Sequence, residues 1–188
     1  MIELKLDKSI WDEVDLRVSK LPIFKRSHRK GAANVVGCLG EVVVEQWLEA
    51  EGIPFIPELD KTTHDYRLIN GQTFDVKTKD RTVAPKPFYD CSIPLYNHEH
   101  QRPDYYIFVS LQRDSKNKSE DASRYHTAYI LGGINQAQLD RHGKVWRAGE
   151  VDPANGTKFW TDCKNVQVST LSPYHVVADK WYGFEKVT

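Results

Sequence analysis

Asn70-Gly71 lies between two runs of residues typical of β-strands, 64–69 and 72–79, and Asn-Gly in this position is the strongest short-range signal for a β-hairpin. A two-residue turn would place Asp65 opposite Val76. A three-residue turn over 69–71 would instead place Asp65 opposite Asp75, with Cβ atoms about 5 Å apart. We predict the three-residue turn, because Gly71 at its last position takes a positive φ without strain.

The second strand of this hairpin carries Asp75 and Lys77 on one face, and Phe74 and Val76 on the other. A half-exposed strand with a polar outer face would explain this alternation without any function. The position of Asp65 favours chemistry, because two neighbouring carboxylates are costly unless a cation neutralises them. Oxygen ligands suit Mg²⁺ or Mn²⁺, and Lys77 could position water or stabilise charge on a phosphate. The pattern therefore predicts metal-dependent hydrolysis of a phosphodiester.

An apolar helix is predicted over residues 32–50, because four large apolar side chains recur at helical spacing and Gly52 and Pro54 follow: Val36, Leu39, Val43 and Trp47. Glu41 lies in the most apolar part of this helix, beside Gly40, which permits close approach of another backbone. Glu45 is one turn further on and shares its face. Either carboxylate could reach a metal at the edge of a sheet, and we favour Glu41.

The remaining elements predict an α/β fold with a mixed β-sheet flanked by helices. We expect an N-terminal helix over 8–20 capped by Asp7 or Ser9, strands over 105–111 and 125–131, and a helix over 135–142 opened by Gly132-Gly133. The polar run 112–121 is expected to be an exposed loop. We treat 1–188 as a single domain with its core over about 31–140 and a C-terminal extension over 144–188.

Charge and composition limit the class of protein. The 188 residues include 26 Lys plus Arg and 26 Asp plus Glu, and no apolar run approaches the ~20 residues of a membrane span. Acids near the N-terminus are unlike a signal peptide, so we expect a cytoplasmic, non-membrane protein. The three cysteines argue against a disulfide framework, and Cys91 with His98 and His100 fits no familiar zinc site.

Basic residues cluster in two segments, 17–30 and 77–86, and the first contains no acid. Such clustering can give a neutral protein one basic face that attracts a polyanion, although a solvated surface is the ordinary explanation. The residues that we predict to contact nucleic acid are Lys79, Arg81, Lys86, Arg29 and Lys30.

Gly40-Glu41, Asp65 and Asp75-Val76-Lys77 together resemble the PD-(D/E)XK nuclease superfamily, which has the restriction-endonuclease-like fold with core order αβββαβ. Residues 103–109 and 129–132 look like its following core strands, and Leu171-Ser172-Pro173 is similar to a pattern in small phage or bacterial members. This chain departs from the family in having His64 where Pro is usual and Asp75 where Glu is commoner.

The resemblance implies a Mg²⁺-dependent DNA endonuclease, with Mn²⁺ a possible substitute and a homodimer a possible assembly. It implies that Asp65, Asp75, Glu41 and Val76 hold the metal and that Lys77 assists the attacking water. Two alternatives stay open: a catalytically inactive nuclease-fold DNA-binding or accessory protein, and a purely structural set of salt bridges.

Two further matches to the family carry less weight. Pro103-Asp104 followed by Asp114-Ser115-Lys116 spells the superfamily motif, but the second part lies in the predicted polar loop, so we reject it as a site. Gln101-x-x-x-Tyr105 matches a motif of the RecB-like branch, but we expect Tyr105 to lie in the core of a strand and give the match little weight.

Overall fold

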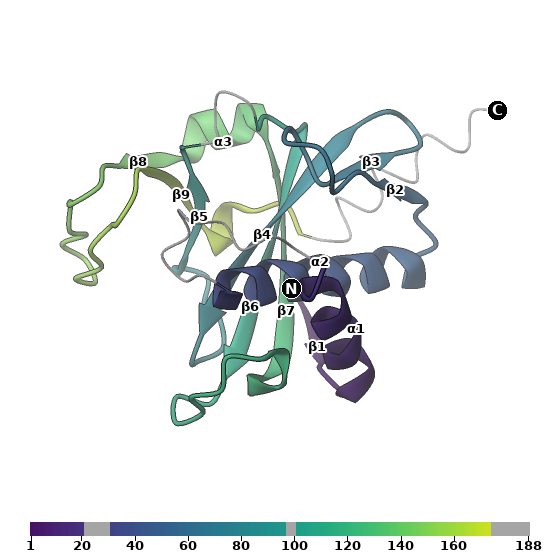
Figure 1. The fold of residues 1–188 in the computed structure, drawn as a ribbon. Coiled ribbons are helices and arrows are strands. Elements are labelled where there is room, and N and C mark those ends of the chain that lie inside the picture. The colour runs from purple at the N-terminus through teal and green to yellow at the C-terminus, as the bar shows by residue number, and fades with distance from the viewer. Residues whose placement is uncertain (21–30, 97–100, 174–188) are drawn as a thin grey trace.

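The computed structural model describes residues 1–20, 31–96 and 101–173, and in it a six-stranded mixed sheet forms the centre of the fold (Figure 1). The strand order is β1-β7-β6-β4-β3-β2, in which β4 and β6 are parallel and the other neighbours are antiparallel. The strands are β1 Ile2–Lys5, β2 Phe55–Pro57, β3 Tyr66–Leu68, β4 Thr73–Arg81, β6 Tyr105–Arg113 and β7 Tyr125–Asn135. The predicted α/β class with a mixed sheet is confirmed.

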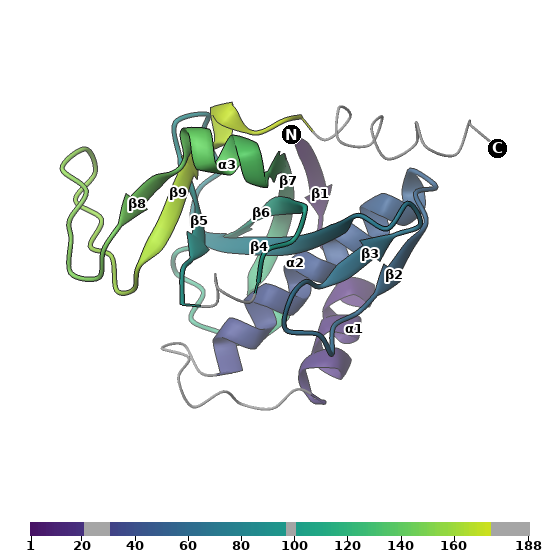
Figure 2. The same ribbon diagram turned by 90° about the horizontal axis from the view of Figure 1, so that it is seen from above.

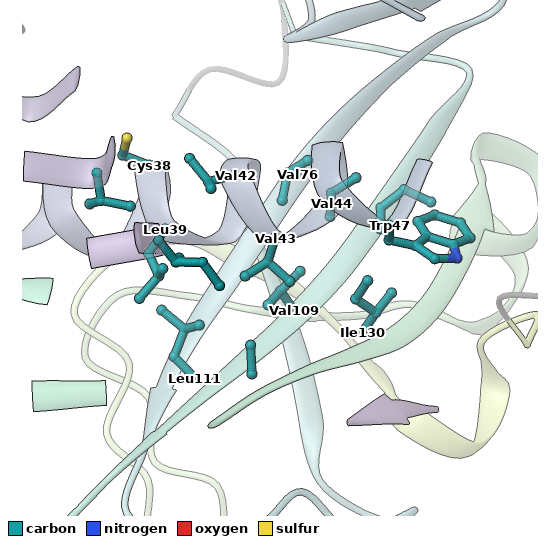
Figure 3. Close-up of a cluster of buried hydrophobic side chains, with 14 of the residues drawn as sticks. Cys38, Leu39, Val42, Val43, Val44, Trp47, Val76, Val109, Leu111 and Ile130 are labelled. Carbon is teal, nitrogen blue, oxygen red and sulfur yellow. The ribbon is translucent and has the colours of Figure 1, made fainter. Parts of the chain in front are cut away.

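Helices α1 (Lys8–Val18) and α2 (Gly31–Ala50) cover one face of this sheet (Figure 2). The apolar stripe of α2 packs on side chains from β4, β6 and β7, as Figure 3 shows for Leu39, Val43, Val76, Val109 and Ile130. Each fully buried side chain of this kind contributes about 1.5–3 kcal/mol to folding. The prediction of α2 is confirmed to within one residue, and Asp7 caps α1 as expected.

The opposite face of the six-stranded sheet is covered by helix α3 (Gln136–His142) and a second, three-stranded sheet (Figure 2). This small sheet has the order β5-β9-β8, formed by β5 Asp90–Pro94, β9 Cys163–Gln167 and β8 Lys144–Trp146. Its buried apolar residues pack with Tyr106 and Phe108 of β6. The six-stranded sheet is therefore buried on both faces, which explains the continuous apolar sequence of β6.

The predicted hairpin register is confirmed. Tyr66 pairs with Phe74 and Arg67 pairs with Thr73, which is the register of the three-residue turn. Gly71 has a φ of +85°, and its N–H donates to the carbonyl of Leu68 at 2.9 Å. The three-residue turn that ends at Gly71 thus sets the register in which Asp65 comes opposite Asp75.

One expectation about the second half of the chain is corrected, and the structure adds detail to two others. Gly132 and Gly133 do not open a helix but continue β7, and α3 begins at Gln136 with Asn135 as its N-cap. Residues 144–173 are more than an extension, because β9 pairs with β5 and Ser172 pairs with Gly133. Between β4 and β6, the described residues contain β5 and no helix, so the expected αβββαβ order is not confirmed.

Among the described residues, no helix combines the length and the hydropathy that crossing a membrane would require.

Helix α2 packs tightly against β4 at Gly40, where the missing side chain permits a close approach. A Cβ at Gly40 would lie 2.9 Å from Cβ and 3.0 Å from Cγ2 of Thr78. Gly40→Ala is therefore expected to lower the free energy of unfolding by about 1–3 kcal/mol, because α2 or β4 must shift.

Gly37→Ala is the matched control, since its Cβ would meet nothing closer than Glu41 Oε1 at 4.0 Å. There we expect a gain of up to about 1 kcal/mol from helix propensity. Urea denaturation of both variants checks this, and equal stabilities would contradict the packing argument.

Candidate active site

The candidate site lies where β3 stops pairing with β4. The N–H of Asp65, just before β3, donates to the carbonyl of Phe74 at 3.2 Å, and the Asp65 carboxylate accepts the N–H of Val76 at 2.9 Å. The side chain of Asp65 thus replaces a strand partner for Val76. Because the N–H and C=O of one strand residue point to the same side, the Val76 carbonyl faces the same gap beside Asp65.

Asp75 and Lys77 of β4 lie on the same face of the sheet as Tyr106 of β6, the partner of Asp75 in the parallel pair. The Asp75 side chain is 0% exposed and forms an ion pair with the ammonium of Lys77, which lies 5.9 Å from the centre of the Tyr106 ring. Asp75 Oδ2 faces this ammonium, yet no donor among the described residues is oriented to hydrogen-bond it. Burying a carboxylate is expensive even when a cation pairs with it, so the buried pair of Asp75 and Lys77 points to a role beyond packing.

The carboxyl groups of Asp65 and Asp75 lie next to each other, and their interaction makes Asp65 a weaker acid. Burial, then the charge and hydrogen bond of Asp75, raise the pKa of Asp65 to about 9. Burial alone would lower the pKa of Lys77, but the attraction of Asp75 and Asp65 raises it above its ordinary value. Asp65 therefore holds its proton more tightly than an ordinary carboxyl group does, beside a lysine whose charged form is favoured.

Glu41 approaches this site from α2. Burial, then the charges of Glu45 and Asp75, raise the pKa of Glu41 to about 7. Glu45, the alternative predicted from the sequence, is committed elsewhere: it accepts two hydrogen bonds from Arg17, at 2.8 and 2.7 Å, and one from the hydroxyl of Tyr66 at 2.6 Å. Of the two glutamates, Glu41 is thus the one with a carboxylate left for the site.

The backbone carrying Asp65 is held by its neighbours. The N–H of Glu58 donates to the Asp65 carbonyl at 2.8 Å, and Glu58 Oε2 lies 2.6 Å from His64 Nε2 and 2.9 Å from Arg67 Nε. His64, then Arg67 and Lys61, hold the pKa of Glu58 down at about 2. The buried His64 ring thus anchors the turn before Asp65.

Gln101 is a site residue to which the sequence analysis gave little weight. Its side-chain N–H donates to Asp75 Oδ1 at 3.2 Å, and its carbonyl oxygen accepts the Lys77 ammonium at 3.2 Å. Tyr106 rather than Tyr105 is the fully buried tyrosine here, and its hydroxyl donates to the Gln101 backbone carbonyl at 3.1 Å. The match of Gln101 to a family motif was the signal that could have identified it.

Only the second part of the rejected motif lies away from this cluster, because Asp104 bonds to Thr73, two residues before Asp75. Asp104 caps the start of β4 by accepting the N–H of Thr73 at 2.8 Å, whereas Asp114 and Lys116 lie in an exposed turn.

The residues predicted to contact nucleic acid differ in how far their side chains are exposed to solvent. Lys79 and Arg81 are half-buried and donate to the Asp90 carbonyl of β5, at 3.2 and 2.8 Å. Their cations hold the small sheet against β4 instead of projecting freely, which alternation along β4 could not reveal. Lys86 is exposed, with its ammonium 5.8 Å from the centre of the Phe88 ring. Arg29 and Lys30 lie outside the described residues.

The donor set fits Mg²⁺ or Mn²⁺ in kind, because it consists of carboxylate oxygens and one strand carbonyl. Within the described ranges, however, no three His, Cys, Asp or Glu side chains are already arranged to hold a metal ion. The site is thus a carboxylate pair closed by Lys77, with Glu41 in electrostatic range. No protein-family model and no curated protein matches this chain in sequence, so the chemistry of the site rests on its geometry.

Proposed function

We propose that this protein is a Mg²⁺-dependent nuclease that hydrolyses phosphodiester bonds in DNA on a restriction-endonuclease-like core. The observation that carries the proposal is the buried cluster of Asp65, Asp75 and Lys77 at the point where β3 leaves β4. The two carboxylates, unable to ionise together cheaply, constitute a site that is completed by a divalent cation.

In this proposal, Asp65, Asp75 and the Val76 carbonyl would hold the ion, and Glu41 would add charge or a further ligand. The ion would polarise the phosphate and activate water. The ion pair with Asp75 holds Lys77 at the site, where its Nζ would orient water or stabilise charge on the phosphate. Gln101 would hold the side chains of Lys77 and Asp75 in position through its two hydrogen bonds.

A second candidate is an inactive nuclease-fold protein that binds DNA. It is favoured by the ion pair of Lys77 with Asp75, because an ammonium in that place can neutralise the carboxylate permanently. Under this alternative the protein would retain DNA in a gel-shift assay, would bind no Mg²⁺ and would cleave nothing.

The test is incubation of the purified protein with linear, circular and branched DNA, with Mg²⁺, with Mn²⁺ and with EDTA. We expect cleavage with either metal and none with EDTA, and the preferred substrate identifies the mode of action. Cleavage that persists unchanged in EDTA would refute the metal-dependent mechanism, and retention of DNA without cleavage would establish the second candidate.

A further inference from the structure

Residues 144–163 form a projecting unit, here called the β8–β9 arm, which comprises β8, the segment after it and the start of β9 (Figures 1 and 2). The arm has a small core of its own, in which the Trp146 and Phe159 rings stack with centroids 4.7 Å apart, beside Cys163. Its turn is fixed by Asp152, which accepts the Ala154 N–H at 3.0 Å and the Asn155 side chain at 2.8 Å. The arm therefore has a defined shape.

The arm presents an aromatic ring and cations to solvent. Trp160 is 74% exposed, and the ammonium of Lys158 lies 5.3 Å from the centre of its ring. A second lysine, Lys144, lies over Trp146 with its ammonium 3.6 Å from the ring centre. Neither lysine forms an ion pair with a described residue. A Trp ring beside unpaired ammonium groups suits a ligand that carries both flat rings and negative charge.

The base of the arm is joined to the segment that leads into the candidate site. Pro94 pairs with Cys163, and the N–H of Leu95 donates to the Asp162 carbonyl at 2.9 Å. Tyr96, 71% exposed, comes next, and Gln101 follows five residues later, where it touches Asp75 and Lys77. An extended chain of that length spans at most about 18 Å. A nucleic-acid strand held at Asp75 is therefore within reach of Tyr96 and the base of the arm.

We propose that Trp160 and Lys158 bind single-stranded DNA, with a base stacked on the indole and a phosphate beside the ammonium. The inference rests on the proposed nuclease function and assigns its substrate class: DNA with an unpaired segment next to the bond that is cleaved. The same ring–cation arrangement gives no advantage with a fully paired duplex, in which the base faces are covered by stacking.

The test is the affinity of the full-length protein for a fluorescent twelve-nucleotide oligo-dT, measured by anisotropy in EDTA so that no cleavage occurs. Trp160→Ala is expected to weaken binding by about 5- to 100-fold, because stacking of one base is lost. Trp160→Phe should stay within about threefold of the wild type, since it keeps a ring. Val151→Ala is the matched control, because Val151 is an exposed apolar residue of the same arm and carries no ring. Its affinity should be unchanged.

A second readout is the salt dependence of binding. Lys158→Ala should reduce the slope of log K against log salt by about 0.7, the value for one single-strand phosphate contact. The proposal is overturned if Trp160→Ala binds oligo-dT as the wild type does, or if it loses affinity for duplex DNA equally. It is also overturned if Trp160→Ala changes the oligomeric state in light scattering without changing affinity, since the ring would then bind protein.

The failures are distinguishable because binding is measured without metal. A wild type that binds oligo-dT through Trp160 but cleaves nothing would refute the nuclease and leave the binding surface intact. A wild type that cleaves DNA, with Trp160→Ala unchanged in both assays, would refute the binding surface alone.

Discussion

Asp75→Asn is expected to reduce Mg²⁺-dependent DNA cleavage by at least about 100-fold while the protein stays folded. Asp75 is the most buried acid of the site and the one that contacts both Lys77 and Gln101. The amide keeps the shape of the side chain but removes the charge that a divalent ion requires. Lys77→Met should lose activity to a similar extent, because the donor for water or phosphate is gone. Cleavage rates, with thermal melting of each variant, check the prediction.

The controls come from the second, rejected copy of the motif. Asp114→Asn and Lys116→Met remove a carboxylate and an ammonium from exposed positions in the turn after β6, away from the cluster. Both should cleave at the wild-type rate. Loss of activity in these variants, with retention in Asp75→Asn and Lys77→Met, would show that the catalytic residues lie outside the cluster of Asp65, Asp75 and Lys77.

Asp65→Asn is expected to stabilise the metal-free protein at pH 8. In the folded state burial and Asp75 raise the pKa of Asp65 to about 9, from an ordinary value of 3.8. Between these two values the folded protein retains a proton that the unfolded chain releases. The free energy of unfolding of the wild type therefore falls as pH rises through this window. Asn carries no titrating proton and keeps an oxygen to accept the Val76 N–H, so it removes this loss.

Thermal melting from pH 5 to pH 8 in EDTA measures the effect. One unit of pKa displacement corresponds to about 1.4 kcal/mol, so the melting temperature of Asp65→Asn should exceed that of the wild type by about 3 °C or more at pH 8. The difference should shrink towards pH 5. Mg²⁺ should raise the melting temperature of the wild type and have little effect on the variant. A variant that is less stable than the wild type at every pH would show instead that the Asp65 carboxylate is a structural group.

The parts of the site that could be predicted are those set by local chemistry. Gly71 determines the turn, the turn determines the register, and the register brings Asp65 to Asp75. The helical spacing of α2 likewise places Glu41, and Gly40 marks its contact with Thr78. Each of these inferences uses residues close together in the sequence, or one turn type with a fixed geometry.

The parts that could not be predicted depend on long-range pairing. Gln101 reaches Asp75 because β6, which follows it, pairs in parallel with β4, and no local pattern reports that pairing. Lys79 and Arg81 share a face with Asp75, as alternation predicts, but β5 and β9 close over that face, and these two strands are far apart in the sequence. Gly132 continues a strand because β6 and Ser172 lie beside it, and only the tertiary structure provides both neighbours.

Titration calorimetry of Mn²⁺ into the wild type and into Asp75→Asn detects binding of the ion without requiring a substrate. We expect saturable binding to the wild type near pH 8, accompanied by release of the proton held at Asp65, and no binding to the variant. Equal heats for the two proteins, or no binding by a folded wild type, would show that these carboxylates do not form a metal centre.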